Sequence, residues 1–351
     1  AGATFSRRKR LVLLGLAFLT GLGMGNHLTL AFIFLPVGVS LFLARRRGLP
    51  VRWVVGQGVL FCVGLLVYLY LPYQARLYPP VNWGNPQTWD GFWWLVTGKP
   101  YQGLLFSAVP AALVDRLAAW LDMFRDQFGL AGVLLGVLGA LQSTTLKKEV
   151  RGLLWWVFGV YSLFAIGYGA ADSTVYLLPV YLVFAVWIAL GAGSFWLASF
   201  NQVAWGKILL AASLIYFGVR FPFILQQENP RQDLRAAGYA QELLRQAPEG
   251  ALILTQGDPD SFPLWYEHYG LKQRPDVAVI VLPLTRYPWY QETLLHTYPA
   301  LTLPAIQLTE GDTSNWGEQV PPLNPQLPVC RTAITSEEPI RVDFTCVPAA
   351  K

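Results

Sequence analysis

The stretch Arg76–Gln102 reads RLYPPVNWGNPQTWDGFWWLVTGKPYQ and has hydrophobic runs on both sides. Its prolines, glycines and polar side chains make it unfit to cross a bilayer, so we expect it to lie at a membrane face. Its large aromatic residues favour the headgroup level, because each ring has an apolar body and a polar edge; they are Trp83, Trp89, Trp93, Trp94, Tyr78 and Tyr101. We interpret the stretch as one wall of a binding site, in which Asn82, Asn85, Gln87 and Gln102 offer uncharged donors and acceptors to a hydroxyl-rich ligand.

The composition indicates a polytopic membrane protein with a water-exposed part. Hydrophobic residues make up 54% of the chain and charged residues 13%, with a mean hydropathy of +0.39. Soluble domains contain roughly 25% charged residues. The net charge of +5 collects in clusters that border hydrophobic runs, at Arg7–Arg10, Arg45–Arg47 and Lys147–Arg151. This placement is typical of charge that sets membrane topology, and it argues against a nucleic acid as a partner.

Hydrophobic runs predict about seven transmembrane helices within residues 1–227. The run from Leu11 to Ala44 exceeds the ~20 residues that a bilayer needs, so we predict two helices with a bend at Asn26–His27. The predicted spans are Leu11–Gly25, Leu28–Ala44, Trp53–Leu71, Phe128–Leu141, Leu153–Ala170, Val175–Ala198 and Lys207–Leu225. We expect a cell membrane (inner or plasma), with the N-terminus cytoplasmic and all three basic clusters inside.

The same topology places the aromatic-rich loop at residues 72–127, and everything after Pro222, on the external side. Within that loop Ala108–Gln127 carries apolar residues at helical spacing, which predicts either an amphipathic helix in the interface or an ordinary packed surface helix. The chain begins next to its first span and without a cleavable leader pattern, and we expect an upstream part.

Residues 228–351 predict a small external α/β domain with a Pro-rich C-terminal part. A helix at Arg231–Gln246, a strand at Gly250–Gln256, a helix at Phe262–Tyr269 and a strand at Val277–Leu282 follow one another. Short strands are expected at Val329–Thr332 and Ile340–Cys346. On the external side Cys330 and Cys346 favour a disulfide, whereas Cys62 lies within a predicted span.

Several polar residues have both a functional and a structural interpretation. Asn26 and His27 either face a cavity or end a helix at the water boundary. Asp172 and Tyr176 share a helical face, although Asp172 also suits an N-cap. Asp258 and Asp260 follow a strand and are candidate ligands of a divalent metal, or else a turn and a helix cap. Arg76 and Arg125 are external cations that a lipid phosphate or a neighbouring aspartate would pair with.

Five motifs taken in order resemble one family. They are MGNHLT at Met24–Thr29, PPVNWGNPQTWDGFWWLVTGKPYQ at Pro79–Gln102, FRDQFG at Phe124–Gly129, DSTVYLLP at Asp172–Pro179, and LTQGDPDSFPLWYEHYGLKQRPDVAVIVLPL at Leu254–Leu284. Together they resemble a bacterial family of polytopic proteins related to a vertebrate transmembrane protein O-mannosyltransferase and similar to GT-C glycosyltransferases. The resemblance implies transfer of a sugar, mannose, from a polyprenyl-phosphate carrier to a protein or glycan hydroxyl on the external face.

The resemblance also implies roles for residues of this chain. Asn26, His27, Arg76, Asn82, Trp83, Asn85, Gln102, Arg125 and Tyr176 are expected to bind the substrate or its lipid phosphate. The family's acidic base lies in a first external loop that precedes the MGNHLT motif and has no match here, so Asp172 and Asp258 are the only substitutes considered. If nothing precedes Ala1 in the cell, we therefore expect the chain to be inactive alone. A divalent metal is not favoured, because Pro259 stands where the family usually has Asn.

Two other classes of function stay open at this stage. A non-catalytic scaffold subunit would bind partners through the external domain, and a transporter would place ionisable residues within the spans, which carry almost none. For a transferase, the aromatic loop, the Asp172 turn and the external domain should converge on one pocket.

Overall fold

A computed structural model describes residues 7–46, 48–107, 110–170, 172–197, 205–306, 316–335 and 340–349. The chain forms two compact units. The helical unit consists of Ala1–Tyr68 and Gly98–Gln227, and the mixed unit of Leu69–Thr97 and Glu228–Lys351. The sequence predicted one boundary, between residues 227 and 228. In the structure the segment Leu69–Thr97 also belongs to the unit that contains the C-terminal region.

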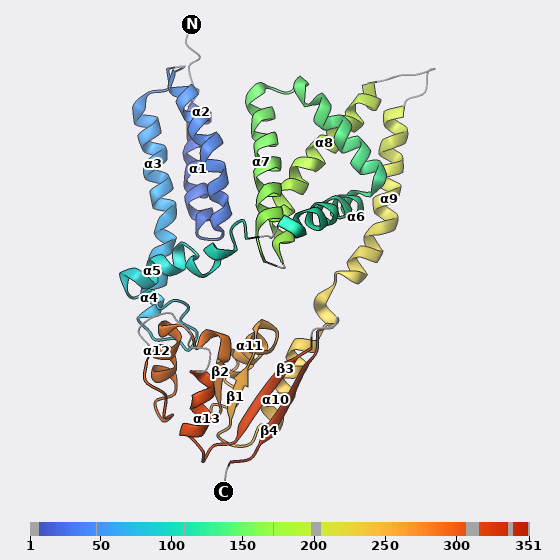
Figure 1. The fold of residues 1–351 in the computed structure, drawn as a ribbon. Helices are drawn as coiled ribbons and strands as arrows, with labels where there is room; N and C mark the ends of the chain where they lie inside the picture. Colours follow the sequence, from blue (N-terminus) through green and yellow to red (C-terminus); the bar gives the residue numbers. More distant parts are fainter. Residues whose placement is uncertain are drawn as a thin grey trace. The chain divides into compact units, whose positions relative to one another are not determined.

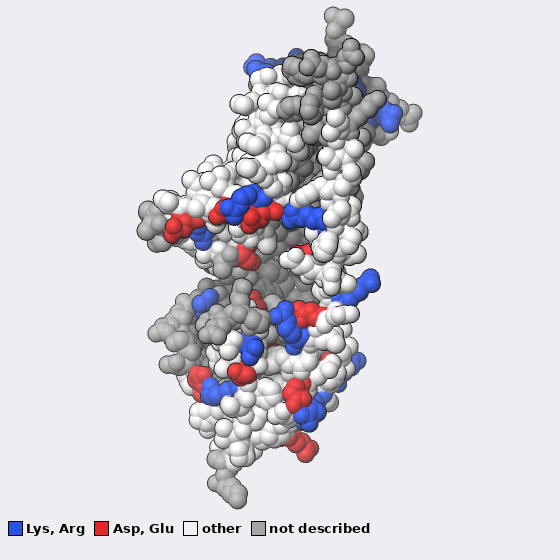
Figure 2. Space-filling model, turned by 90° about the vertical axis from the view of Figure 1, so that its right-hand side faces the viewer, with Lys and Arg blue, Asp and Glu red and all other residues white. Residues whose placement is uncertain are grey.

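The helical unit is built from long apolar helices, labelled in Figure 1. They are α1 (Arg7–Met24), α2 (Phe34–Arg46), α3 (Val51–Leu65), α6 (Pro110–Gln142), α7 (Lys148–Gly167), α8 (Leu178–Leu197) and α9 (Trp205–Gln227). Single turns of 3-10 helix lie at Leu28–Ile33, Leu66–Leu69, Lys99–Leu104, Ser143–Thr145 and Ser173–Leu177. On the face shown in Figure 2, charged residues gather at the ends of this unit and leave its middle uncharged.

Five segments among the described residues are long and apolar enough to cross a membrane, which indicates a multi-pass membrane protein. They are Leu28–Arg46, Val51–Ala75, Ala112–Thr145, Lys148–Gly167 and Ser173–Ser194. The first and seventh predicted spans are helical as α1 and α9 but are not among the five. Helix α1 has 18 residues and includes the basic cluster Arg7–Arg10, which lowers its suitability for the bilayer core.

Two helix pairs approach so closely that only glycine fits at the crossing. A Cβ at Gly21 of α1 would lie 2.1 Å from the carbonyl oxygen of Phe61 on α3, and Gly64 faces α1 in the same way. A Cβ at Gly139 of α6 would lie 1.7 Å from the carbonyl oxygen of Trp187 on α8. Small residues at helix crossings are typical of membrane proteins, where close backbone packing replaces the hydrophobic effect.

Helix α6 contains a sharp bend at Gly129, which has φ 67° and ψ 167°. The part before the bend covers the predicted amphipathic helix, and the part after it covers the predicted span Phe128–Leu141. Figure 1 shows the first part running crosswise to α7. Phe124 is buried against α7 and α8, while Leu117 on the first part stays 49% exposed. An apolar exposed face of this kind suits a helix in the interface.

The mixed unit contains a four-stranded sheet in the order β2-β1-β3-β4. Its strands are β1 (Leu252–Thr255), β2 (Ala278–Val281), β3 (Val329–Ile334) and β4 (Val342–Val347), and only β4 runs antiparallel to its neighbour. Its helices are α4 (Tyr70–Ala75), α5 (Trp89–Val96), α10 (Arg235–Gln246), α11 (Asp258–Trp265), α12 (Pro288–Thr297) and α13 (Val320–Leu323). Shorter turns lie at Pro230–Gln232, Tyr266–Gly270 (a π-helix), Leu282–Leu284 and Gly317–Gln319. The predicted fold class is confirmed.

The sheet is covered on both faces, as its alternating side chains require. Ile253 and Val279 pack with α10 and α11 on one face. Leu254 and Ile280 pack on the other face with α12 and with Trp94 from α5. The edge strand β2 has its outward N–H groups satisfied, because Val279 donates to the hydroxyl of Tyr298 and Val281 to that of Tyr290, both at 2.9 Å.

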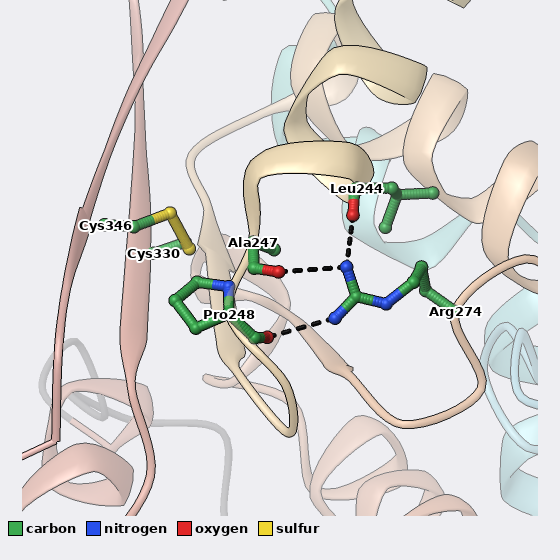
Figure 3. Close-up of a disulfide and its surroundings, with 6 residues drawn as sticks. All are labelled: Leu244, Ala247, Pro248, Arg274, Cys330 and Cys346. Atoms are coloured by element: carbon green, nitrogen blue, oxygen red, sulfur yellow. Dashed lines mark hydrogen bonds between the residues drawn. A yellow bond between two sulfur atoms is a disulfide. The ribbon is translucent and has the colours of Figure 1, made fainter.

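The predicted disulfide joins Cys330 and Cys346 at paired positions of β3 and β4 (Figure 3). Figure 3 also shows Arg274, whose guanidinium donates to the carbonyl oxygens at the end of α10 and of the residues that follow, Leu244, Ala247 and Pro248. The ion pair of Arg274 with Asp276, at 2.8 Å, lowers the pKa of that carboxyl group. A cation at a helix C-terminus satisfies carbonyls that have no partner within the helix.

Candidate functional site

The aromatic loop folds back on itself because α5 contacts its own preceding turn. The hydroxyl of Thr88 accepts a hydrogen bond from the N–H of Gly91 at 3.0 Å and caps the helix. A Cβ at Gly91 would lie 2.3 Å from the carbonyl oxygen of Asn85, so only glycine allows this approach. Asn85 has φ 40° and Tyr78 φ 49°, both in the left-handed region that side chains rarely adopt. Strained residues of this kind often mark functional sites.

The tryptophans of the loop divide into a buried and an exposed group. Trp94 is 8% exposed, with its ring centroid 5.5 Å from that of Tyr287, and Trp83 lies 5.5 Å from Trp289. Trp89 is 73% exposed and Trp93 43%. The prediction that all four lie at the headgroup level is therefore wrong for Trp94, which belongs to the core of the mixed unit, and Trp83 packs against that core.

A chain of amide hydrogen bonds connects the loop to α12. Asn82 donates to the side-chain oxygen of Asn85 at 3.1 Å, and Gln87 donates to the same oxygen at 3.1 Å. The amide nitrogen of Asn85 donates to a carboxylate oxygen of Glu292 at 3.2 Å. The network joins residues 207 positions apart and brings together two predicted site residues and one, Glu292, that sequence reasoning missed.

The same residues line a small pocket, which we call the loop pocket: Tyr78, Pro79, Asn82, Asn85, Glu292, Thr293 and His296. It has room for about one water molecule or one hydroxyl group. Asn82 and Thr293 are each 6% exposed and form its polar interior, while Tyr78 is 50% exposed at its edge. The four-residue spacing of Glu292 and His296, which places both on one helix face, is the signal that would have found them.

The helical unit contains a second group, which we call the helix-end cluster. It consists of the predicted residues His27, Asp172 and Tyr176 together with Tyr168, which was not predicted. His27 accepts a hydrogen bond from the N–H of Thr29 at 3.3 Å and caps a 3-10 turn. Its ring centroid lies 5.4 Å from that of Tyr176, which lies 5.4 Å from that of Tyr168. Burial, followed by the nearby Tyr176 and Asp172, raises the pKa of Tyr168 to about 12. The rings of His27, Tyr176 and Tyr168 thus pack edge to face, each on the next.

Arg116 on α6 was not a predicted site residue, yet it binds the end of α7 at Tyr168 of this cluster. Its guanidinium donates to the carbonyl oxygens of Ile166 at 3.2 Å and Tyr168 at 2.6 Å, at the end of α7. Arg125 on the same helix is exposed and pairs with Asp122 at 3.1 Å. The sequence allowed either a lipid phosphate or an aspartate as the partner of Arg125, and in the structure the partner is an aspartate.

The remaining predicted residues other than Asp260 all lie on the surface. Arg76 and Asp258 are exposed, Gln102 lies in the exposed 3-10 turn Lys99–Leu104, and Asn26 precedes His27 in an exposed turn. The described residues contain no cluster of three or more side chains suited to a metal ion.

Asp260 is fully buried and acts as a helix cap. Its carboxylate accepts from the N–H groups of Gln256 at 2.7 Å and Gly257 at 2.9 Å, and from the hydroxyl of Thr332 on β3. These donors occupy both carboxylate oxygens, so the carboxylate links the end of β1 to the start of α11 and to β3.

Residues 236–313 match the family described as TMEM260-associated domain 2. The mouse (Mus musculus) protein O-mannosyl-transferase TMEM260 is 23% identical over 323 residues, which are 85% of this chain and 45% of the relative. The protein O-mannosyl-transferase tmem260 of Dictyostelium discoideum is 21% identical over 317 residues, or 79% of this chain and 38% of the relative. No solved structure matches. The chain spans less than half the length of these curated relatives. It is a distant homologue of the TMEM260 protein O-mannosyltransferases over most of its length.

Proposed function

We propose that this chain forms part of a membrane glycosyltransferase that moves mannose from a polyprenyl-phosphate carrier to a protein or glycan hydroxyl on the external face. The observation that carries the proposal is the distant homology to a protein O-mannosyl-transferase across 85% of the chain. The multi-pass helical unit supports it, because a polyprenyl-linked donor resides in a bilayer.

The reaction would be a displacement at the anomeric carbon. The acceptor oxygen forms a bond to C1 of mannose, the bond between C1 and the carrier phosphate breaks, and polyprenyl phosphate leaves with the electron pair. A base takes the proton of the acceptor hydroxyl. We assign no base among the described residues.

The test uses membranes from the host organism in three states: with the gene for this protein intact, deleted, or restored. Membranes receive a radiolabelled polyprenyl-phosphate mannose and a peptide rich in serine and threonine. We expect deletion to abolish label transfer and release of polyprenyl phosphate, and the wild-type gene to restore both. Full transfer in the deleted strain would overturn the proposal. Transfer that persists in the deleted strain, together with a fixed partner that co-purifies with the wild-type protein, would favour a scaffold.

Site variants sharpen this experiment. Asn82→Ala removes a 6% exposed amide of the loop pocket and should lower transfer at least tenfold. Asn229→Ala is the matched control, because Asn229 is exposed and caps only the short turn Pro230–Gln232. Equal activities of the two variants would remove the loop pocket from the proposed mechanism.

A further inference from the structure

The loop pocket contains one carboxylate that keeps most of its hydrogen-bonding capacity. Glu292 is half-buried and accepts one hydrogen bond, from the amide of Asn85 at 3.2 Å. Among the described residues it forms no ion pair, and the pocket lining contains no Lys or Arg. A carboxylate has about four acceptor positions, so Glu292 keeps most of its capacity for hydroxyl donors.

The interior of the pocket offers further unused hydrogen-bonding groups. Asn82 uses one amide hydrogen for Asn85, and among the described residues its side chain makes no other hydrogen bond. Thr293 donates its hydroxyl proton to the carbonyl oxygen of Trp289 at 2.8 Å, which leaves its lone pairs free to accept. A ligand that enters the pocket could use these remaining donor and acceptor positions.

The edge of the pocket is aromatic. The rings of Tyr78 and His296 lie 4.2 Å apart at 37° and are both exposed. Tyr78 holds φ 49°, a conformation that is sterically unfavourable for a residue with a side chain. An aromatic platform beside a few placed polar groups is the usual design of a small-molecule site with a partly apolar ligand.

The charge of the pocket decides between two ligand classes. A phosphate would be repelled by the carboxylate of Glu292, and the lining contains no Lys or Arg to offset that repulsion. A neutral sugar has hydroxyl protons for the carboxylate, oxygens for the amide of Asn82 and an apolar ring face for Tyr78. The space for about one hydroxyl group fits a single hydroxyl or hydroxymethyl group, with the sugar ring lying on the edge.

We propose that the loop pocket is a subsite for a neutral hexose, in which Glu292 and Asn82 bind one hydroxymethyl or hydroxyl group and Tyr78 packs against the ring. This inference deepens the proposed function and rests on it for the identity of the sugar. It assigns the loop asparagines to a sugar and not to the lipid phosphate.

The test measures binding of methyl α-mannopyranoside to the full chain in nanodiscs by saturation-transfer NMR, with inorganic phosphate as a second probe. We expect saturation of the sugar protons and no competition by phosphate. Glu292→Ala should weaken sugar binding at least tenfold, because a hydrogen bond to a charged group is lost. His296→Ala should weaken it less.

Leu295→Ala is the matched control on the same helix, since Leu295 is 40% exposed and does not line the pocket. Equal binding by Glu292→Ala and Leu295→Ala would overturn the inference, and so would competition by phosphate. Should Glu292→Ala fail to fold, Tyr78→Asn decides the matter, because asparagine tolerates the left-handed conformation and removes only the platform.

Binding and transfer separate the two proposals. Sugar binding that depends on Glu292, in a protein whose deletion leaves mannosyl transfer intact, would support the subsite and refute the proposed function. Transfer that survives Glu292→Ala unchanged, in a protein whose deletion abolishes it, would refute the subsite and leave the proposed function standing.

Discussion

Gly91→Ala is the sharpest perturbation that the structure offers. An alanine Cβ would lie 2.3 Å from the carbonyl oxygen of Asn85 and 2.5 Å from that of Gly84. Ordinary carbon–oxygen contacts of this kind are about 3.3–3.6 Å, so α5 must move about 1 Å away from its preceding turn. Both obstacles are backbone atoms, and no side-chain rotation relieves the contact. The same movement pulls Trp94 from the core, where it is 8% exposed.

The expected cost of this overpacking is about 1–3 kcal/mol. If that cost falls on local opening of the loop, amides in α5 should exchange their hydrogens about 5 to 150 times faster. Hydrogen–deuterium exchange with mass spectrometry, performed on the full chain in nanodiscs, measures this rate peptide by peptide. Binding of methyl α-mannopyranoside should fall in parallel, because Asn85 is displaced with the turn.

Gly238→Ala provides the matched control for the same chemical change. Gly238 lies in α10 of the same unit, and a Cβ there meets nothing within 4 Å. Alanine in an open helical position stabilises by roughly 0.5–1 kcal/mol, so exchange should slow or stay unchanged. Exchange in α5 of Gly91→Ala that stays within twofold of wild type would refute the close approach described here.

Three further predictions concern the mixed unit. Tyr290→Phe leaves the N–H of Val281 without its acceptor, and exchange measurements on β2 should report a loss of about 1–3 kcal/mol. Replacing Cys330 and Cys346 by alanine opens a loop with a separation of 16 residues and should cost about 3 kcal/mol, measured by pulse proteolysis. Burial lowers the pKa of His268 below its usual 6.5. The contribution of the neutral imidazole to the free energy of unfolding is therefore fully present above pH 6.5 and is lost as the pH falls through the lowered pKa. His268→Gln should flatten this pH dependence, measured by thermal unfolding.

Each of these predictions has a control within the chain. Tyr266→Phe removes a hydroxyl from a side chain that is 62% exposed, and should leave β2 unchanged. Cys62→Ala should have no effect outside the helical unit, and a reductant should destabilise the wild type but not the double cysteine variant. His296→Gln changes an exposed histidine and should keep the pH dependence. If a control variant shows the same change as its test variant, the corresponding prediction is contradicted.

Local patterns predicted the elements of the fold well. The strand prediction Gly250–Gln256 contains β1, and Val277–Leu282 contains β2, because both runs are apolar on both faces as central parallel strands are. Helix α11 begins at Asp258, earlier than predicted, because the carboxylate of Asp260 binds the backbone N–H groups at its start. These hydrogen bonds depend on the burial of Asp260 in the folded unit. The spacing of residues in the sequence does not reveal that burial.

Long-range packing produced what the sequence did not predict. The segment Pro288–Thr297 mixes aromatic, amide and aliphatic residues without a clear period, so no helix was predicted there. It becomes α12 because Trp289 and Tyr290 are buried against the sheet and against Trp94 of the loop. Glu292 enters the loop pocket only through this packing, so its link to Asn85 depends on the whole mixed unit.

Helix α5 connects two surfaces with different requirements. Its residue Trp94 is buried in the core of the mixed unit, whereas Trp89 is 73% exposed and packs edge-on against Trp93 at 5.5 Å. Exposed tryptophans of this kind favour a headgroup region. Because Gly91 lies between them and contacts the carbonyl oxygen of Asn85, the exposed aromatic face and the loop pocket are not free to move independently. A helix that enters the headgroup region through Trp89 would hold the loop pocket beside the membrane, where the proposed transferase would meet its lipid-carried sugar.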